Sequence, residues 1–131
     1  MKDFCIIGSG ISGSTIAQIL GKKYSLDVYD KARGAGGRSS NKKFNKNESF
    51  DHGVQYISPK NIQFKKFINN LIKKKIVKRW LGKHLFLNPN KKEDKKHIKI
   101  IGNKGNNSIS KYLLKDINCI FNTELIKISY K

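Results

Sequence analysis

The sequence predicts an α/β fold that opens with a strand–helix–strand unit built on a parallel sheet. Three observations support this prediction. A short apolar run, Phe4–Ile7, leads directly into a glycine-rich turn, and apolar residues at helical spacing follow the turn. A second apolar run, Leu26–Tyr29, then ends in an acidic residue, Asp30. Parallel strands need a crossover connection such as a helix, and we expect this one to be right-handed.

The first strand and helix follow from their apolar patterns. The run Phe4–Ile7 is continuous rather than alternating, which is typical of a central parallel strand buried on both faces. Ile16, Ile19 and Leu20 fall at helical spacing, and Gly21 is a suitable stop for that helix.

Composition predicts a loop over residues 31–47, which are rich in Gly, Ser, Asn and Lys. A short strand or turn is expected over residues 50–56. Ser58 is a good helix N-cap, and Pro59 suits the first helical position after it. The helix expected there carries an amphipathic stripe of Phe64, Phe67, Ile68, Leu71 and Ile72.

The remainder of the chain reads as short strands, turns and one further helix. The helix is marked by Ile109, Tyr112 and Leu113, and turns are expected at residues 88–90 and 102–107. The expected strands cover residues 76–81, 84–87, 97–101, 117–121 and 125–130.

Length and composition limit the class of protein. A chain of 131 residues with 37% hydrophobic residues is the size of one ordinary domain with a core. No apolar run approaches the roughly 18 to 20 residues that span a bilayer, and no room for a leader peptide precedes Phe4, so we expect a cytoplasmic protein without membrane contact. Cys5 and Cys119 lie in apolar runs without metal-ligand spacing, and we expect them to be buried free thiols.

The net charge of +19 is large, but it comes almost entirely from lysine. Of the 28 basic residues, 25 are Lys and 3 are Arg, and Asn and Ile are abundant too. This pattern is typical of a compositional bias across a genome. Such a charge attracts polyanions in general. However, the lysines are spread out without interleaved aromatic pairs, so we do not expect specific nucleic-acid binding.

The glycine turn has the spacing of a dinucleotide-binding site. Gly8, Gly10 and Gly13 form a G-x-G-x-x-G pattern of the Rossmann-like βαβ unit, with Asp30 about 20 residues further on. Gly8 allows the tight turn, Gly10 allows a pyrophosphate to approach the backbone, and Gly13 allows close packing of helix on strand. The free amides at the start of the helix suit a phosphate, and the Asp30 carboxylate suits the ribose hydroxyls.

Arginine use points to the same region. Two of the three Arg residues, Arg33 and Arg38, fall within one glycine patch in a chain that otherwise uses Lys. A guanidinium offers a bidentate fork to phosphate that an ammonium lacks. Arg79, beside Trp80, has no comparable context, and we interpret it as a surface residue.

These residues resemble a known family. The three segments Gly8-x-Gly10-x-x-Gly13, Asp30-Lys31-x-Arg33-Gly34-x-Gly36-Gly37-Arg38 and Phe50-Asp51-x-Gly53-x-Gln55-Tyr56 are similar to the flavin-containing amine oxidase superfamily. Within it they look most like the renalase-like branch of NAD/FAD-dependent oxidoreductases. The resemblance implies FAD as cofactor, with the second segment over its pyrophosphate and ribityl chain and the third beside the flavin ring. The cofactor-binding residues expected on these grounds are Gly8, Gly10, Ile11, Ser12, Gly13, Asp30, Lys31, Arg33, Gly37, Arg38, Gly53, Val54, Gln55 and Tyr56.

The resemblance continues to the end of the chain but covers only the front of such an enzyme. The turn and helix of residues 102–113 are similar to the segment that returns to the FAD domain, although Lys104 and Asn106 stand where the family usually has Pro and Met. Thr123–Ile128 is similar to a strand near the adenine. The expected domains are thus an incomplete FAD-binding domain, 1–57 and 101–131, and the start of an interrupting α+β substrate domain, 58–100.

The expected activity is hydride transfer to flavin from a small reduced substrate of amine or dihydronicotinamide type. Because FAD carries that chemistry, we name no catalytic side chain. The expected partners are a small molecule, related to NAD(P)H in one of these cases, and a complementary C-terminal chain that supplies the part of the enzyme not seen here. Two alternatives remain open: a noncatalytic dinucleotide- or polyanion-binding module, and a truncated remnant that needs a second chain.

Overall fold

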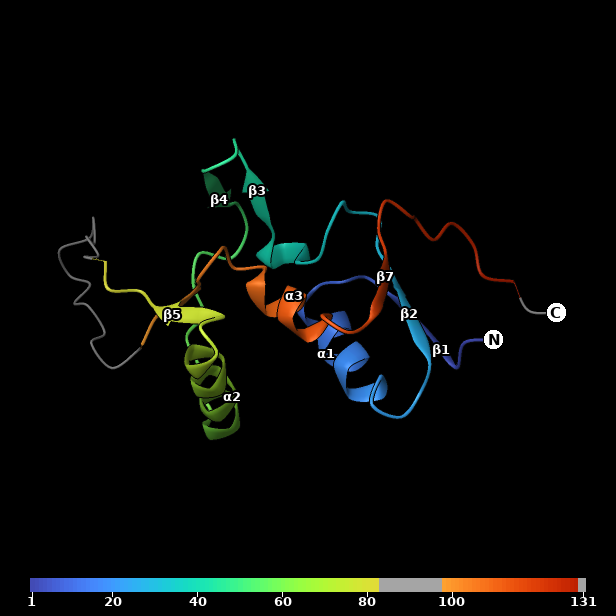
Figure 1. Ribbon diagram of the computed structural model, residues 1–131, viewed down its shortest axis with the longest axis horizontal. Coiled ribbons are helices and arrows are strands. Elements are labelled where there is room, and N and C mark those ends of the chain that lie inside the picture. The colour runs from blue at the N-terminus through green and yellow to red at the C-terminus, as the bar shows by residue number, and fades with distance from the viewer. Residues whose placement is uncertain (83–97, 130–131) are drawn as a thin grey trace, which may run out of the picture.

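The computed structural model describes residues 1–82 and 98–129, and it is elongated, with two halves (Figure 1). A parallel sheet with its helix forms one half, and a helix packed on a small hairpin forms the other. The elements are β1 (Phe4–Ile7), α1 (Ile11–Leu20), β2 (Leu26–Tyr29), the 3-10 turn η1 (Gly37–Ser39), β3 (Asn41–Lys43), β4 (Ser49–Asp51), α2 (Ile62–Lys73), β5 (Val77–Arg79), β6 (Ile100–Gly102), α3 (Ser108–Leu113) and β7 (Asn118–Ile120).

The parallel sheet has the strand order β1-β2-β7, and both pairs of neighbours are parallel. The crossover from β1 to β2 runs through α1, as the apolar pattern predicts. Ala17 of α1 is fully buried and packs in one cluster with Leu26 and Val28 of β2. The predicted α/β fold with a Rossmann-like βαβ unit is therefore confirmed.

The other face of this sheet is open, and here the prediction was wrong. β1 is not buried on both faces: Phe4 is 40% and Ile7 50% exposed, and Cys5, expected to be buried, is exposed as well. Among the described residues β1 pairs only with β2, so it forms an edge of the sheet. A continuous apolar run is typical of a covered strand, but here the described residues 123–125 leave a pocket of about 290 Å³ lined by Phe4, Cys5 and Ile7.

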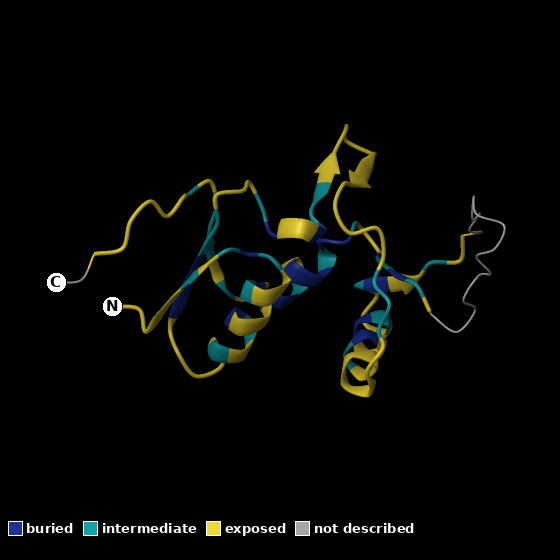
Figure 2. Ribbon diagram, turned by 180° about the vertical axis from the view of Figure 1, so that it is seen from behind, coloured by how far each residue is buried: buried dark blue, intermediate teal, exposed yellow. Residues whose placement is uncertain are grey.

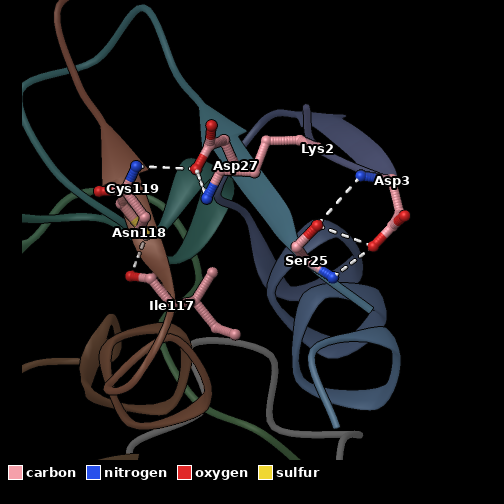
Figure 3. A network of polar contacts seen from close by, with 7 residues as sticks. All are labelled: Lys2, Asp3, Ser25, Asp27, Ile117, Asn118 and Cys119. Atoms are coloured by element: carbon pink, nitrogen blue, oxygen red, sulfur yellow. Dashed lines mark hydrogen bonds and ion pairs between the residues drawn. The ribbon is translucent and has the colours of Figure 1, made fainter. Parts of the chain in front are cut away.

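A polar network connects the amino-terminal ends of β1, β2 and β7 (Figure 3). The Asn118 side chain donates to Asp27 Oδ1 over 2.7 Å across β7 and β2, and Lys2 Nζ lies 3.1 Å from the same oxygen. The Asn118 hydrogen bond and then Lys2 lower the pKa of Asp27 from its ordinary value. Beside them, the backbone N–H and Oγ of Ser25 both donate to Asp3 Oδ2 over 2.7 Å.

The second half has its own core, where α2 packs on the antiparallel pair β5–β6. Ile68 and Leu71 of α2 are buried, and the outward side of the helix is exposed (Figure 2). Helix α3 belongs to both halves, because Ile109 and Leu113 enter this second core while the following Leu114 enters the core of the parallel sheet. Helix α3 thus joins the two halves.

The amphipathic stripe of α2 is confirmed at its buried residues, but the predicted start of the helix was wrong. The helix begins at Ile62, and Asn61 is its N-cap, with Oδ1 accepting a hydrogen bond from the backbone N–H of Phe64 over 2.7 Å. Ser58 and Pro59 lie in the preceding loop, where the backbone of Ile57 pairs with Ile100 of β6. That pairing keeps the chain extended up to the cap.

Other element predictions need correction. Residues 31–47 are not all loop, because they contain η1 and β3, and β3 pairs antiparallel with β4. Residues 125–129 form no strand, and they pair with none of the described strands. In α1, Ile16 and Ile19 are 50% and 60% exposed, and the buried residues of the helix are Ser14 and Ala17. The strand expected at 84–87, the turn at 88–90 and residues 97 and 130 lie outside the described residues.

Within residues 1–82 and 98–129, no helix combines the length and apolar character needed to cross a bilayer. In the same residues no three His, Cys, Asp or Glu side chains gather in a way that would hold a metal ion. The division into 1–57 with 101–131 and 58–100 stays a prediction, as does the cytoplasmic location.

The buried face of α2 gives a test of the second core. Leu71→Ala should lower the free energy of unfolding by about 2 to 5 kcal/mol, because Leu71 is fully buried and its removal leaves a cavity. Ile62→Ala, on the same helix but 71% exposed, is the matched control and should change it by less than about 0.5 kcal/mol. Urea unfolding followed by circular dichroism measures both, and equal losses would contradict the packing described.

Candidate dinucleotide-binding site

The strand-to-helix turn depends on glycine at two points. Gly8 has φ +97°, a conformation that side chains disfavour, and its N–H donates to the Tyr29 carbonyl over 2.8 Å. A Cβ on Gly13 would lie 1.9 Å from the Gly8 carbonyl oxygen, so α1 approaches the turn closely only because residue 13 has no side chain. Both requirements match the roles predicted for these glycines.

A cavity of about 550 Å³ lies at the N-terminus of α1. No side chain caps this helix: its N-cap is Gly10, and the helix begins with Ile11. The amides of the first turn have no intrahelical partner and carry the positive end of the helix dipole. The residues that line the cavity are Ile7, Gly8, Gly10, Ile11, Ser12, Gly13, Gly36, Gly37, Arg38, Ser39 and Val54.

The second glycine segment packs directly against the first. The Gly36 N–H donates to the Ser9 carbonyl over 3.1 Å, and Gly10 and Gly36 form an isolated parallel bridge. A Cβ on Gly37 would lie 3.1 Å from the Cα of Gly10, and Gly37 has a φ of +52°. Two segments that are 26 residues apart in sequence therefore form one wall of the cavity.

Asp30 is held by the glycine turn rather than open to the cavity. Its Oδ2 accepts from both the backbone N–H and the Oγ of Ser9, with the N–H at 2.6 Å, and its Oδ1 accepts from the Ala32 N–H over 2.8 Å. Partial burial favours the protonated acid, but the hydrogen bonds from Ser9 and Ala32 outweigh it and lower the pKa of Asp30. Asp30 does not line the 550 Å³ cavity itself.

Ser9, which sequence reasoning treated only as a spacer, is therefore a structural centre of the site. It is fully buried, and its carbonyl accepts from both the Gly36 N–H and the Ser14 Oγ, each over 3.1 Å. The combination of a small hydroxyl residue inside the glycine motif with an acid at the end of the next strand was the signal available in the sequence.

The third predicted segment reaches the cavity through Val54 alone. A Cβ on Gly53 would lie 2.0 Å from the Arg38 carbonyl oxygen, and the Val54 N–H donates to that same oxygen over 2.9 Å. Gln55 does not line the cavity, and Tyr56 packs against Trp80 with ring centroids 5.7 Å apart. The third segment thus packs against the backbone of Arg38 through Gly53 and Val54.

Asn106, at a position where the resemblance would have Met, holds this segment in place. It is fully buried, its Nδ2 donates to the Val54 carbonyl over 2.6 Å, and its Oδ1 accepts from the Gly102 N–H over 2.8 Å. Its own N–H donates to Asp51 Oδ1 over 2.8 Å. A methionine side chain could make neither of the two amide hydrogen bonds, to Val54 and from Gly102.

Two predicted cationic residues lie away from the cavity. Lys31 and Arg33 are exposed on the loop after β2, and Lys31 Nζ is 3.8 Å from the Glu124 carboxylate, an exposed pair of small energetic value. Beside this loop the chain after β7 returns to the end of β2, because the Thr123 N–H donates to the Asp30 carbonyl and the Asn122 N–H to the Ala32 carbonyl, both over 3.0 Å. Residues 122 and 123 therefore border the Asp30 end of the site.

This fold and this cavity define the class of protein: a nucleotide-binding α/β protein of the Rossmann type. A family model described as an NAD(P)-binding Rossmann-like domain matches residues 6–71, which is just over half of the chain. The chain belongs to this family. The matched range includes all three glycine segments and ends within α2.

Comparison with solved structures finds putrescine oxidase. Two mutants from a structure-based redesign of its cofactor binding are 26% and 25% identical, both with a TM-score of 0.46, and the wild type bound to putrescine is 25% identical with a TM-score of 0.45. Each match covers 60% of this chain and 17% of the putrescine oxidase chain. No curated protein sequence gives a significant match.

The lowered pKa of Asp30 predicts how stability depends on pH. Because its folded-state pKa lies below its unfolded value, the ionised carboxylate stabilises the fold above about pH 4, and this contribution is lost as the pH falls through the folded-state value. Asp30→Asn should therefore be less stable than the wild type near pH 7, with a difference that shrinks as the pH falls below about 4. Urea unfolding across this range measures it, and Asp116→Asn, an exposed residue, should show no such trend.

The close contact at Gly13 gives a second test. Gly13→Ala should lower the melting temperature because its methyl group would clash with the Gly8 carbonyl, which is backbone and has little freedom to move. Gly34→Ala is the matched control, since nothing lies within 4 Å of a Cβ built there. Thermal unfolding by circular dichroism compares the two, and equal stability of both variants would contradict the helix-to-turn packing.

Proposed function

We propose that the chain is the FAD-binding part of a renalase-like oxidoreductase that transfers hydride to flavin from a small reduced substrate of amine or dihydronicotinamide type. The single observation that carries this proposal is the contact of Gly36 and Gly37 with Ser9 and Gly10, which makes one cavity from two glycine segments. A site that binds only a nicotinamide dinucleotide would not need the second segment.

The residues around the cavity fit the pyrophosphate of FAD. The first-turn amides of α1 would donate to its oxygens. Gly10 leaves room for the pyrophosphate, because it has no side chain and the nearest atom to a Cβ built there is the Gly37 Cα, 3.9 Å away. Arg38 lines the cavity and would add a charge-assisted hydrogen bond. Asp30 Oδ1, with one backbone partner, retains a lone pair for a ribose hydroxyl, and its negative charge disfavours a 2′-phosphate.

When bound, FAD supplies the hydride acceptor, and the described residues bind and orient it. Ser9, Asp30 and Gly36 fix the turn, so the amides of α1 are already aimed when the ligand arrives. This arrangement limits the entropy lost on binding. No described side chain is assigned a proton-transfer role.

A further protein segment, from a longer form of this chain or from a second chain, completes the site in this proposal. The open face of β1, where Cys5 and Ile7 are exposed, and its unpaired edge support this expectation. Unpaired strand edges with apolar faces are usually covered in stable proteins. The substrate pocket would be formed largely by that segment.

A noncatalytic module that binds the ADP part of a dinucleotide is the second candidate function. The position of Tyr56 favours it: this residue, expected beside the flavin ring, packs instead against Trp80 and Lys99 of the other half. Such a module would bind ADP-ribose and NAD as well as FAD.

Ligand-induced thermal shifts distinguish the two candidates. A ligand that binds only the native state raises the melting temperature, by an amount that grows with the logarithm of its concentration relative to its Kd. FAD, NAD, ADP-ribose and single-stranded DNA should be compared with the chain alone and with a complementary C-terminal segment of a flavin amine oxidase. A shift by FAD well above that of ADP-ribose supports the flavin site, and equal shifts by FAD, NAD and ADP-ribose support the module. No shift by any dinucleotide, even with the added segment, would refute both.

A substitution at Gly10 tests ligand binding without affecting the stability of the fold. Gly10→Ala should leave the melting temperature of the free protein nearly unchanged, because its φ of −68° is ordinary and the nearest atom to a new Cβ is 3.9 Å away. The same methyl group would occupy the space needed by the pyrophosphate, so FAD affinity should fall by at least about tenfold, or ~1.4 kcal/mol. Fluorescence titration of FAD measures the affinity, and unchanged binding would contradict the assignment of this cavity.

A further inference from the structure

The described residues of the half built from α2, β5 and β6 carry charge of one sign. Residues 54–82 and 98–115 contain twelve Lys and Arg residues and no Asp or Glu. The acidic residues of the described chain belong to the parallel sheet and its loops, on the other side of the molecule, and to the β3–β4 hairpin, which lies on the same side as α2 (Figure 1). A field of one sign over one half attracts ligands of the opposite charge.

A groove of about 460 Å³ lies between α2 and the β5–β6 hairpin within this half. This volume is within the range of small-molecule sites, roughly 300 to 1,000 Å³. The floor is apolar, with Ile68 and Ile100 almost fully buried and Ile72 partly so. The polar and charged side chains that line it are Lys60, Lys65, Asn69 and Arg79.

Three cations from three separate segments therefore meet at one groove. Lys60 precedes α2, Lys65 lies in its first half, and Arg79 ends β5. All three are exposed, and none forms an ion pair with a carboxylate among residues 1–82 and 98–129. Like charges gathered without a neutralising acid repel one another, and a bound anion would relieve that repulsion.

Arg79 is one of few arginines in this chain, and it lines the groove. The sequence has three Arg residues against 25 Lys, and the sequence alone left Arg79 as a surface residue. The structure places it in the groove with two lysines, where its planar fork can bind two oxygens of one anion. The rarity of Arg was the signal that could have marked it.

We propose that this groove is a second anion-binding site, distinct from the cavity at α1, which binds a small phosphomonoester with an apolar body. A phosphomonoester carries nearly two negative charges at neutral pH and three acceptor oxygens, which suits a cluster of two lysines and one arginine. The isoleucine floor adds burial of an aromatic or aliphatic group, which inorganic phosphate lacks. A diamine such as putrescine is repelled.

The probe for this site is phenyl phosphate, and the matched variants are Lys65→Gln and Lys66→Gln. The two lysines are adjacent on α2, both are exposed, and the substitutions change the net charge equally, but only Lys65 lines the groove. Titration calorimetry on the full 131-residue chain should give at least a roughly tenfold weaker affinity for Lys65→Gln and an unchanged affinity for Lys66→Gln. Equal weakening of both variants would overturn the proposal, because it would show nonspecific attraction by net charge.

One further variant and several further ligands test which chemical groups the groove binds. Arg79→Lys keeps the charge but loses the fork, so it should bind phenyl phosphate more weakly than the wild type. Inorganic phosphate and phenol should each bind more weakly than phenyl phosphate, and putrescine should not bind. If inorganic phosphate bound as well as phenyl phosphate, or if a single-stranded oligonucleotide bound more tightly with Lys65 and Lys66 contributing equally, the proposal would be wrong.

The same measurement separates this site from the dinucleotide site. Gly10→Ala alters the cavity at α1 and leaves the groove intact, so it should bind phenyl phosphate with the affinity of the wild type. Loss of phenyl phosphate binding in Gly10→Ala would place the ligand in the cavity at α1 and refute a second site. Circular dichroism of each variant confirms that it is folded.

Discussion

The site depends on one buried serine whose every polar group is bonded inside the protein. Ser9 gives both its donors to Asp30, and its carbonyl accepts from Gly36 and from Ser14 of α1. These bonds connect the end of β2, the start of α1 and the second glycine segment. Because an unpaired polar group in such a position is costly, the three parts hold one another in a single arrangement. The cavity at the helix terminus is a consequence of that arrangement.

The bond to Ser9 changes the meaning of the acidic residue in the motif. In the sequence, Asp30 suggests only a ligand contact, but the structure uses one of its oxygens to anchor the turn. A carboxylate with Oδ2 fixed in this way presents Oδ1 in a defined direction, with a single backbone donor from Ala32. The ribose contact that we propose is thus a use of the remaining lone pair, and anchoring and ligand binding do not exclude one another.

The sequence predicted the parts of the fold that follow from local pattern and backbone sterics. The strand–turn–helix–strand unit belongs to this group, because φ values and missing Cβ atoms are properties of single residues. The place of the second glycine segment near the first was implied only by the family resemblance. The predictions were wrong where burial, strand pairing or the start of a helix depends on residues distant in the sequence. Phe4 and Ile7 are apolar but 40% and 50% exposed, and residues 125–129 pair with none of the described strands. The N-cap of α2 is Asn61 rather than Ser58, and the preceding Ile57 pairs with the distant Ile100. The role of Asn106 likewise depends on contacts more than 50 residues away, with Asp51 and Val54.

The two proposed sites use different physics to hold phosphate, and this difference separates them from a general effect of the +19 charge. At α1 the donors are backbone amides and a helix dipole, and Arg38 is the cationic residue that lines the cavity among the described residues. In the groove the donors are three exposed cationic side chains. Salt screens exposed charges over about 8 to 10 Å at physiological ionic strength, whereas short amide hydrogen bonds are screened much less. Binding in the groove therefore weakens steeply with added salt, and binding at the glycine turn does so only slightly. A chain whose lysines merely attracted anions would show one steep salt dependence for every ligand.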